Sequence, residues 1–228
     1  ALFIYNESID IPTFALLIVS LGQNVPPQNP VIGIYTQTLS NTTTDKSSYI
    51  AASYVKFIEM SGAQVVPIYS FANTSDILTL LGKINGVLFP GQSFLILRWR
   101  HVVLTQQSMT KNADAIFKYA KDQNDKGNPF PIFATCLGHQ LVSYLTSNYD
   151  DSILTRVHGD DAIVLPITFV NEGYLFATFN SNQKDKVTKG HGVYYFNHNW
   201  AVTLETFSTN LYLKNFWNLI ATGTTPQN

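Results

Sequence analysis

The side chain best suited to chemistry is Cys136, the single cysteine of the 228 residues. It follows the apolar run 130–134 and precedes Leu137 and Leu141, which lie at helical spacing. A thiol at the turn between a buried strand and a helix meets the helix macrodipole and free N–H groups, which stabilise a thiolate. A lone cysteine also excludes an intrachain disulfide and a cysteine-cluster metal site. Cys136 is therefore either a small buried side chain or a nucleophile, and its setting favours the nucleophile.

Acyl transfer also needs backbone N–H groups that hold an oxyanion. The Leu137 N–H follows the cysteine directly, and Gly138 allows close approach of the backbone at that turn. A second apolar run, 86–89, ends in a Pro-Gly turn that offers the Gly91 N–H. Ligands of parallel sheets bind beyond the carboxyl ends of the strands. The sequence thus predicts Cys136, Gly91 and Leu137 as the catalytic group, arranged as a nucleophile elbow.

Strands and helices alternate as far as residue 150, which is the order of an α/β protein with a mostly parallel sheet. Continuous apolar runs predict buried strands at residues 31–35, 63–69, 86–89 and 130–134. Apolar residues at helical spacing predict helices at residues 47–61, 76–81 and 101–125. Helices between parallel strands cover both faces of the sheet. The two turns of the site follow parallel strands, so we expect both at the carboxyl edge of the sheet.

Beyond residue 150 the pattern changes to short alternating segments. The alternation at 161–168 and 201–207 predicts antiparallel strands, which we interpret as an insertion on the main sheet. Length and composition suit one domain, residues 31–228, preceded by an N-terminal extension, residues 1–30.

The extension contains an apolar run, 14–21, of the length of a signal-peptide core. No basic residue precedes Lys46, however, whereas a signal peptide begins with a basic region. Both a signal-like segment and an ordinary buried segment therefore stay open. N-x-S/T sequons at Asn6, Asn41 and Asn73 fit a secretory route.

The charge is low and evenly mixed, with 14 basic and 15 acidic residues and a formal net charge of -1. Such a chain has no basic footprint for nucleic acid or for an anionic membrane. The run 14–21 is too short for a membrane span, which takes roughly 20 residues. We therefore expect a small-molecule partner and neither nucleic acid nor a membrane span.

Four segments between Val31 and Trp217 resemble the γ-glutamyl hydrolase family of the class I glutamine amidotransferase-like superfamily. They are residues 48–56 (SYIAASYVK), 84–91 (INGVLFPG), 135–138 (TCLG) and 198–200 (HNW). The first is the most specific, because the wider amidotransferases share the cysteine turn but not that helix sequence.

The resemblance implies a three-layer flavodoxin-like sandwich for residues 31–228, with the C-terminal part expected to be truncated. It implies a cysteine-type omega peptidase that hydrolyses γ-glutamyl bonds, notably of folate polyglutamates, through a thioester and without a cofactor. It also implies a lysosomal or secreted protein, and it leaves a homodimer open.

Residue by residue, the resemblance makes Cys136 the nucleophile and assigns the oxyanion-hole backbone to Gly91 and Leu137. It places Tyr54 and His198 along the substrate cleft, although Tyr54 also lies on the apolar stripe of its helix. Gln140 stands at a further substrate position, where glutamine-using amidotransferases have Gln and γ-glutamyl hydrolases often have Glu.

Two other departures keep alternatives open. Gln92 replaces the second Gly of the family's Pro-Gly-Gly, and the family's general-base histidine belongs to a segment beyond residue 228. His139 is expected to point away from the thiol, and His198 is the histidine we expect nearest to it. A glutaminase subunit that feeds a synthase, and a binding-only relative or inactive fragment, are therefore the alternatives to a hydrolase.

Overall fold

The computed structural model describes residues 2–5, 29–38, 48–91, 107–157, 163–164, 166–171, 176–189, 195–196 and 200–224. The chain divides into two compact units. One unit is Pro27–Leu145, and the other combines Ala1–Pro26 with Thr146–Asn228.

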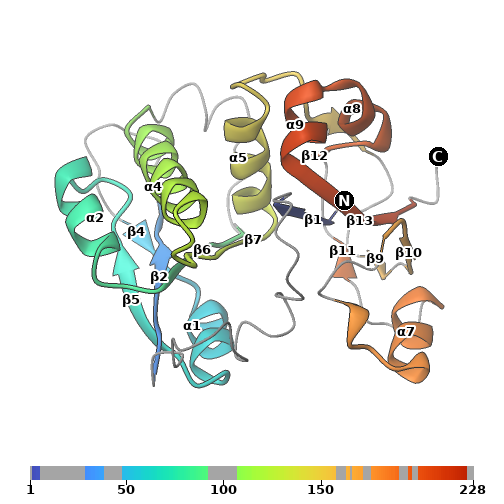
Figure 1. The fold of residues 1–228 in the computed structure, drawn as a ribbon, viewed down its shortest axis with the longest axis horizontal. Helices are drawn as coiled ribbons and strands as arrows, with labels where there is room; N and C mark the ends of the chain where they lie inside the picture. Colours follow the sequence, from blue (N-terminus) through green and yellow to red (C-terminus); the bar gives the residue numbers. More distant parts are fainter. Residues whose placement is uncertain are drawn as a thin grey trace. The chain divides into compact units, whose positions relative to one another are not determined.

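A parallel four-stranded sheet forms the centre of the unit Pro27–Leu145 (Figure 1). Its strands are β5 (Gln64–Ile68), β2 (Val31–Tyr35), β6 (Gly86–Phe89) and β7 (Ile132–Ala134), in that spatial order. Each neighbouring pair is parallel. The first strand of this sheet in chain order, β2, thus lies between the second and the third, which is the flavodoxin-like order. The predicted α/β fold with a mostly parallel sheet is confirmed.

Successive side chains of a strand point to opposite faces of the sheet, so both faces present side chains that helices can cover. Helices lie on both faces of this sheet. On one face, Ile34 of β2 and Leu88 of β6 form a buried cluster with Ile58 of α1 (Ala52–Glu59). On the other face, the Tyr35 hydroxyl donates to the Met109 carbonyl oxygen of α4 (Gln107–Asp125) at 2.6 Å. Figure 1 shows α1 on one side of the sheet and α2 (Thr74–Leu81), α4 and α5 (Leu137–Thr146) on the other.

The predicted helix at 47–61 is shorter in the structure. Ser48 and Tyr49 form β4, which pairs antiparallel with β3 (Gln37–Thr38), and the helix starts only at Ala52. Cross-strand pairing has therefore overridden the helical spacing at the start of this segment. The four predicted strands are confirmed, with ends that shift by one or two residues.

The other unit contains an antiparallel sheet in the order β1 (Leu2–Tyr5), β13 (Trp217–Gly223) and β10 (Ile167–Phe169). Its buried cluster consists of Ile167, Phe176, Val187, Ile220 and Ala221. Two further antiparallel pairs join β9 (Ile163–Val164) to β11 (Tyr195–Phe196) and β8 (Thr155–Arg156) to β12 (Trp200–Ala201). Among the described residues, no strand beyond residue 150 pairs with the parallel sheet.

The prediction of a strand at 201–207 is wrong beyond Ala201. The chain turns at Thr203 into α8 (Leu204–Thr209), and α9 (Leu211–Phe216) follows. The Thr203 hydroxyl accepts a hydrogen bond from the Thr206 N–H at 3.1 Å, which caps the helix and stabilises its first turn. Helix α7 (Ser181–Thr188) begins with a reciprocal capping box between Asn180 and Gln183.

In the described part of the chain, the helices lack the length and apolar character needed to cross a membrane. The apolar run 14–21 lies outside the described residues.

Candidate active site

Cys136 occupies the turn between β7 and α5 and is a half-buried free thiol. Its φ angle is 52°, which lies in the left-handed region that non-glycine residues seldom adopt. Backbone hydrogen bonds hold both sides of the turn: the Thr135 N–H donates to the Phe89 carbonyl oxygen at 3.1 Å, and the Gln140 N–H donates to the Cys136 carbonyl oxygen at 3.0 Å. Such an unusual φ angle at a nucleophilic residue points to function, since it persists only where the surroundings enforce it.

Gly138 brings the start of α5 against the end of β6. A Cβ atom at this position would lie 2.2 Å from the carbonyl oxygen of Phe89 and 2.6 Å from its carbonyl carbon. The Gly138 N–H donates to the Pro90 carbonyl oxygen at 3.2 Å. The close backbone approach predicted for Gly138 is confirmed, and it joins the turns that follow β6 and β7.

Gly91 lies directly beside the thiol. A Cβ atom on Gly91 would be 2.6 Å from Cys136 Cβ and 3.3 Å from Cys136 Sγ. The Gly91 N–H donates to the Tyr54 hydroxyl oxygen at 2.8 Å. A hydrogen-bond donor of the backbone and an oxygen acceptor thus meet next to the only sulfur nucleophile of the chain.

Tyr54 belongs to α1 and packs its ring against the cluster of Ile34, Ile58 and Leu88. Burial raises the pKa of Tyr54, and the nearby Cys136 and Tyr49 raise it further, while the hydrogen bond from Gly91 acts in the opposite direction. The hydroxyl therefore stays neutral near pH 7. It accepts from Gly91 and keeps its own proton for donation. Tyr54 thus packs against the apolar cluster and accepts a hydrogen bond from Gly91, and its predicted place along the substrate cleft stays a prediction.

Gln37 was not among the residues predicted from the sequence. It follows β2 at the same edge of the sheet, its side chain is only 6% exposed, and its Nε2 donates to the Gly91 carbonyl oxygen. The same Nε2 lies 3.3 Å from the Pro90 carbonyl oxygen. Its signal in the sequence is a polar residue two positions past the end of a buried strand, near the edge where parallel sheets place their ligands.

The other predicted site residues fall into two groups. Leu137 is the first residue of α5, where N–H groups have no partner within the helix, and Gln140 lies half-buried in the same helix. Gln92 and His198 lie outside the described residues. His139 of α5 is the one histidine in the described ranges, and the other histidines, His101, His158 and His191, fall outside them with His198.

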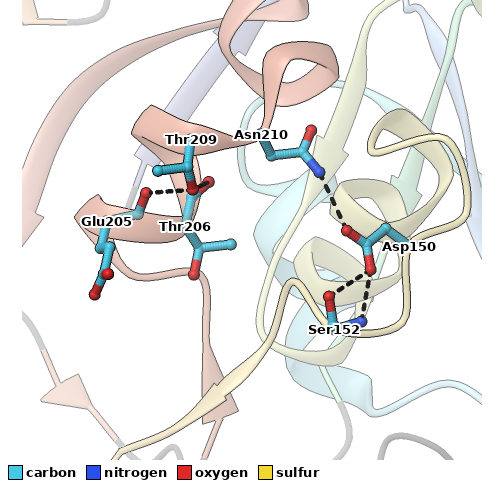
Figure 2. A pocket seen from close by; sticks show the side chains of 6 residues that line it. All are labelled: Asp150, Ser152, Glu205, Thr206, Thr209 and Asn210. Carbon is cyan, nitrogen blue, oxygen red and sulfur yellow. Dashed lines mark hydrogen bonds between the residues drawn. The ribbon is translucent and has the colours of Figure 1, made fainter.

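A cavity of about 340 Å³ lies in the unit that includes residues 146–228 (Figure 2). Its lining consists of Asp150, Ser152, Glu205, Thr206, Thr209 and Asn210. As Figure 2 shows, the Asp150 carboxylate accepts from Ser152 and from the Asn210 amide, the latter at 3.4 Å. Among the described residues, its lining contains neither a cysteine nor a histidine.

Fold and site together define the class: a flavodoxin-like α/β protein with a free cysteine at the turn between a parallel strand and a helix. Residues 30–147 match the Peptidase C26 family, and the chain belongs to this family.

Curated relatives are similar over most of the chain. The γ-glutamyl hydrolase of Rattus norvegicus is 34% identical over an alignment of 206 residues that covers 86% of this chain and 60% of the rat protein. γ-Glutamyl hydrolase B of Dictyostelium discoideum is 31% identical over 88% of this chain and 56% of its own length. The human γ-glutamyl hydrolase is 32% identical over 86% of this chain and 60% of its own length. The chain thus spans little more than half the length of these relatives.

Proposed function

We propose that the protein hydrolyses γ-glutamyl bonds with Cys136 as the nucleophile. The observation that carries the proposal is the position of Cys136: a strained residue at the start of a helix, with the backbone of Gly91 in contact with it. The relatives named γ-glutamyl hydrolase support the choice of bond. Within that class we infer folate polyglutamates as the substrate and a lysosomal or secreted location, both from the family resemblance.

The reaction proceeds as an acyl transfer. The Cys136 thiolate attacks the γ-carbonyl carbon, a C–S bond forms, and the π electrons of the carbonyl move onto its oxygen. The N–H groups of Gly91 and Leu137 hold that oxyanion, and the substrate oxygen takes the place of the Tyr54 hydroxyl at the Gly91 donor. The carbonyl then re-forms as the C–N bond breaks, and the leaving amine takes a proton from a general acid. The group that gave this proton then takes one from water, whose oxygen adds to the thioester carbonyl. The C–S bond breaks, the glutamyl carboxylate and the Cys136 thiolate are released, and the second proton of the water passes to solvent.

Cys136→Ala in the protein at its natural full length tests this proposal. We expect the variant to lose hydrolysis of a γ-glutamyl dipeptide by at least about 10³-fold, because the attacking thiol is removed. Ser108→Ala, at an exposed position of α4, is the matched control and should keep full activity. Iodoacetamide should add one more carbamidomethyl group to the parent than to Cys136→Ala, read by intact mass.

Substrate preference separates the alternatives. A γ-glutamyl peptide, the corresponding α-glutamyl peptide, free glutamine and a pteroylpolyglutamate are compared by kcat/KM. The proposal requires the γ-linked peptides to be cleaved fastest, with progressively shorter folate products. Faster turnover of free glutamine would make the protein a glutaminase, and an unaffected Cys136→Ala variant would end the assignment of the nucleophile.

A further inference from the structure

A buried side-chain amide supports the turn after β6. Gln37 and the residues that it contacts, Pro90 and Gly91, are 53 and 54 positions apart in the chain. Burying an amide is costly unless its hydrogen bonds are made, and the Gln37 Nε2 makes them to backbone carbonyls of this turn. The contact is therefore a specific link between the end of β2 and the end of β6.

The geometry of the Pro90–Gly91 peptide explains what this link controls. The Pro90 carbonyl and the Gly91 N–H belong to one peptide group, and in a planar trans peptide they point in opposite directions. Two donors hold the carbonyl oxygen: the Gly138 N–H at 3.2 Å and the Gln37 Nε2 at 3.3 Å. The Gly91 N–H is thereby directed to the opposite side, where it meets the Tyr54 hydroxyl beside Cys136.

Gln37 also fixes the next peptide group. Its Nε2 donates to the Gly91 carbonyl oxygen, so one side chain restrains the peptide groups on both sides of Gly91. A glycine has more freedom in φ and ψ than any other residue, so this restraint matters most at Gly91. Without Gln37, the carbonyl end of the donor peptide would keep only the bond from Gly138, and its N–H end would keep the bond to Tyr54, which the substrate oxygen displaces.

We propose that Gln37 is a positioning residue that keeps the Gly91 N–H directed at the oxyanion formed on Cys136. This inference rests on the proposed acyl-transfer function. It predicts that the loss of Gln37 lowers the rate of the chemical step more than it lowers substrate affinity, since an oxyanion exists only in the transition state and the intermediate.

Gln37→Met keeps the length of the side chain and removes its donor. In the protein at its natural full length we expect kcat for a γ-glutamyl dipeptide to fall by about one to two powers of ten, with little change in KM. Alkylation of Cys136 by iodoacetamide should keep its rate, because attack on a methylene carbon creates no oxyanion. Gln64→Met, at an exposed position of β5, is the matched control and should leave all three quantities unchanged.

Gln37→Glu supplies a readout that a purely structural role would not move. The ionised carboxylate has no proton to donate and faces two carbonyl oxygens, whereas the protonated carboxyl can donate to one of them. Burial in this position raises the pKa of the introduced carboxyl. The ratio of kcat for Gln37→Glu to kcat for Gln37→Met should therefore rise as the pH is lowered from about 8 to about 5.

The outcomes separate this inference from the proposed function. Unchanged kcat in Gln37→Met, together with an inactive Cys136→Ala, would overturn the role of Gln37 and leave the nucleophile in place. A fall in alkylation rate that parallels the fall in kcat would also overturn it, because it would indicate general distortion. Activity retained by Cys136→Ala would instead overturn the proposed function.

If Gln37→Met does not fold, the variant Gln37→Glu decides the question. Its kcat is divided by the kcat of the parent at each pH. A ratio that rises toward low pH supports the role of Gln37, and a flat ratio rejects it.

Discussion

The turns after β6 and β7 meet at one edge of the parallel sheet but obtain their shapes in different ways. After β7, the left-handed φ angle of 52° belongs to a cysteine, although such an angle usually selects glycine. After β6, the glycine is not among the residues with positive φ, and what excludes a side chain there is the neighbouring Cys136. The turn after β7 thus has a strained backbone at the thiol residue. The turn after β6 has a glycine, whose missing side chain lets its backbone N–H lie close to that thiol.

The difference shows that two residues of one site can be held in place by different kinds of contact. The strain at Cys136 is local, and the hydrogen bonds of Thr135 and Gln140 enforce it. The position of Gly91 depends on distant partners, Gln37 and Tyr54, which reach it through side chains. Replacing a glycine by alanine should therefore mainly lower stability at the turn after β7 and mainly lower kcat at the turn after β6.

The largest effect is expected where the two turns are in contact. Gly138→Ala would place a methyl group 2.2 Å from the Phe89 carbonyl oxygen, and a backbone atom cannot move aside as a flexible side chain can. We expect the free energy of unfolding to fall by about 3 kcal/mol, measured by urea denaturation.

Gly82→Ala is the matched control for this substitution. Gly82 ends α2 with φ of -65°, and the nearest atom to a Cβ there is the Thr79 carbonyl oxygen at 3.7 Å. An alanine should therefore be neutral or slightly stabilising at this position. Equal losses from the two substitutions would contradict the close contact between the turns.

Gly91→Ala should affect catalysis more than stability. The methyl group would meet Cys136 Cβ at 2.6 Å and the Tyr54 hydroxyl at 2.8 Å, and the Tyr54 side chain can rotate away. The donor N–H would be displaced, so we expect kcat to fall by about 10²-fold, with a smaller loss of unfolding free energy than in Gly138→Ala. Steady-state kinetics and denaturation of the same preparations give both values. A variant that loses stability but keeps kcat would remove Gly91 from the oxyanion site.

The sequence predicted the parallel sheet because its strands are continuous apolar runs, such as 86–89, bounded by turn residues. It predicted Cys136 and Gly91 as site candidates because both follow such strands. It did not predict Gln37, because a polar residue near a strand end does not by itself identify a partner, and the hydrogen bonds of Gln37 join residues 53 and 54 positions apart. The helix at 204–209 was missed because Val202 and Leu204 alternate as in a strand, although Leu204 and Phe207 lie at helical spacing. The cap at Thr203 starts the helix.

The smallest effect concerns the strain at Cys136 and is a comparison of two variants. Neither Cys136→Gly nor Cys136→Ala retains a thiol, so their stabilities differ only through the backbone preference and one methyl group. At a φ angle of 52° alanine is strained and glycine is not, so we expect Cys136→Gly to be more stable than Cys136→Ala by about 1 kcal/mol in urea denaturation.

Lys111, an exposed position within α4, is the control. There Lys111→Gly must be less stable than Lys111→Ala, because glycine in a helix costs about 1 kcal/mol relative to alanine. If glycine were the less stable choice at both positions, the left-handed backbone at Cys136 would not store strain. The contrast between the two turns would then rest on the close packing of Gly91 alone.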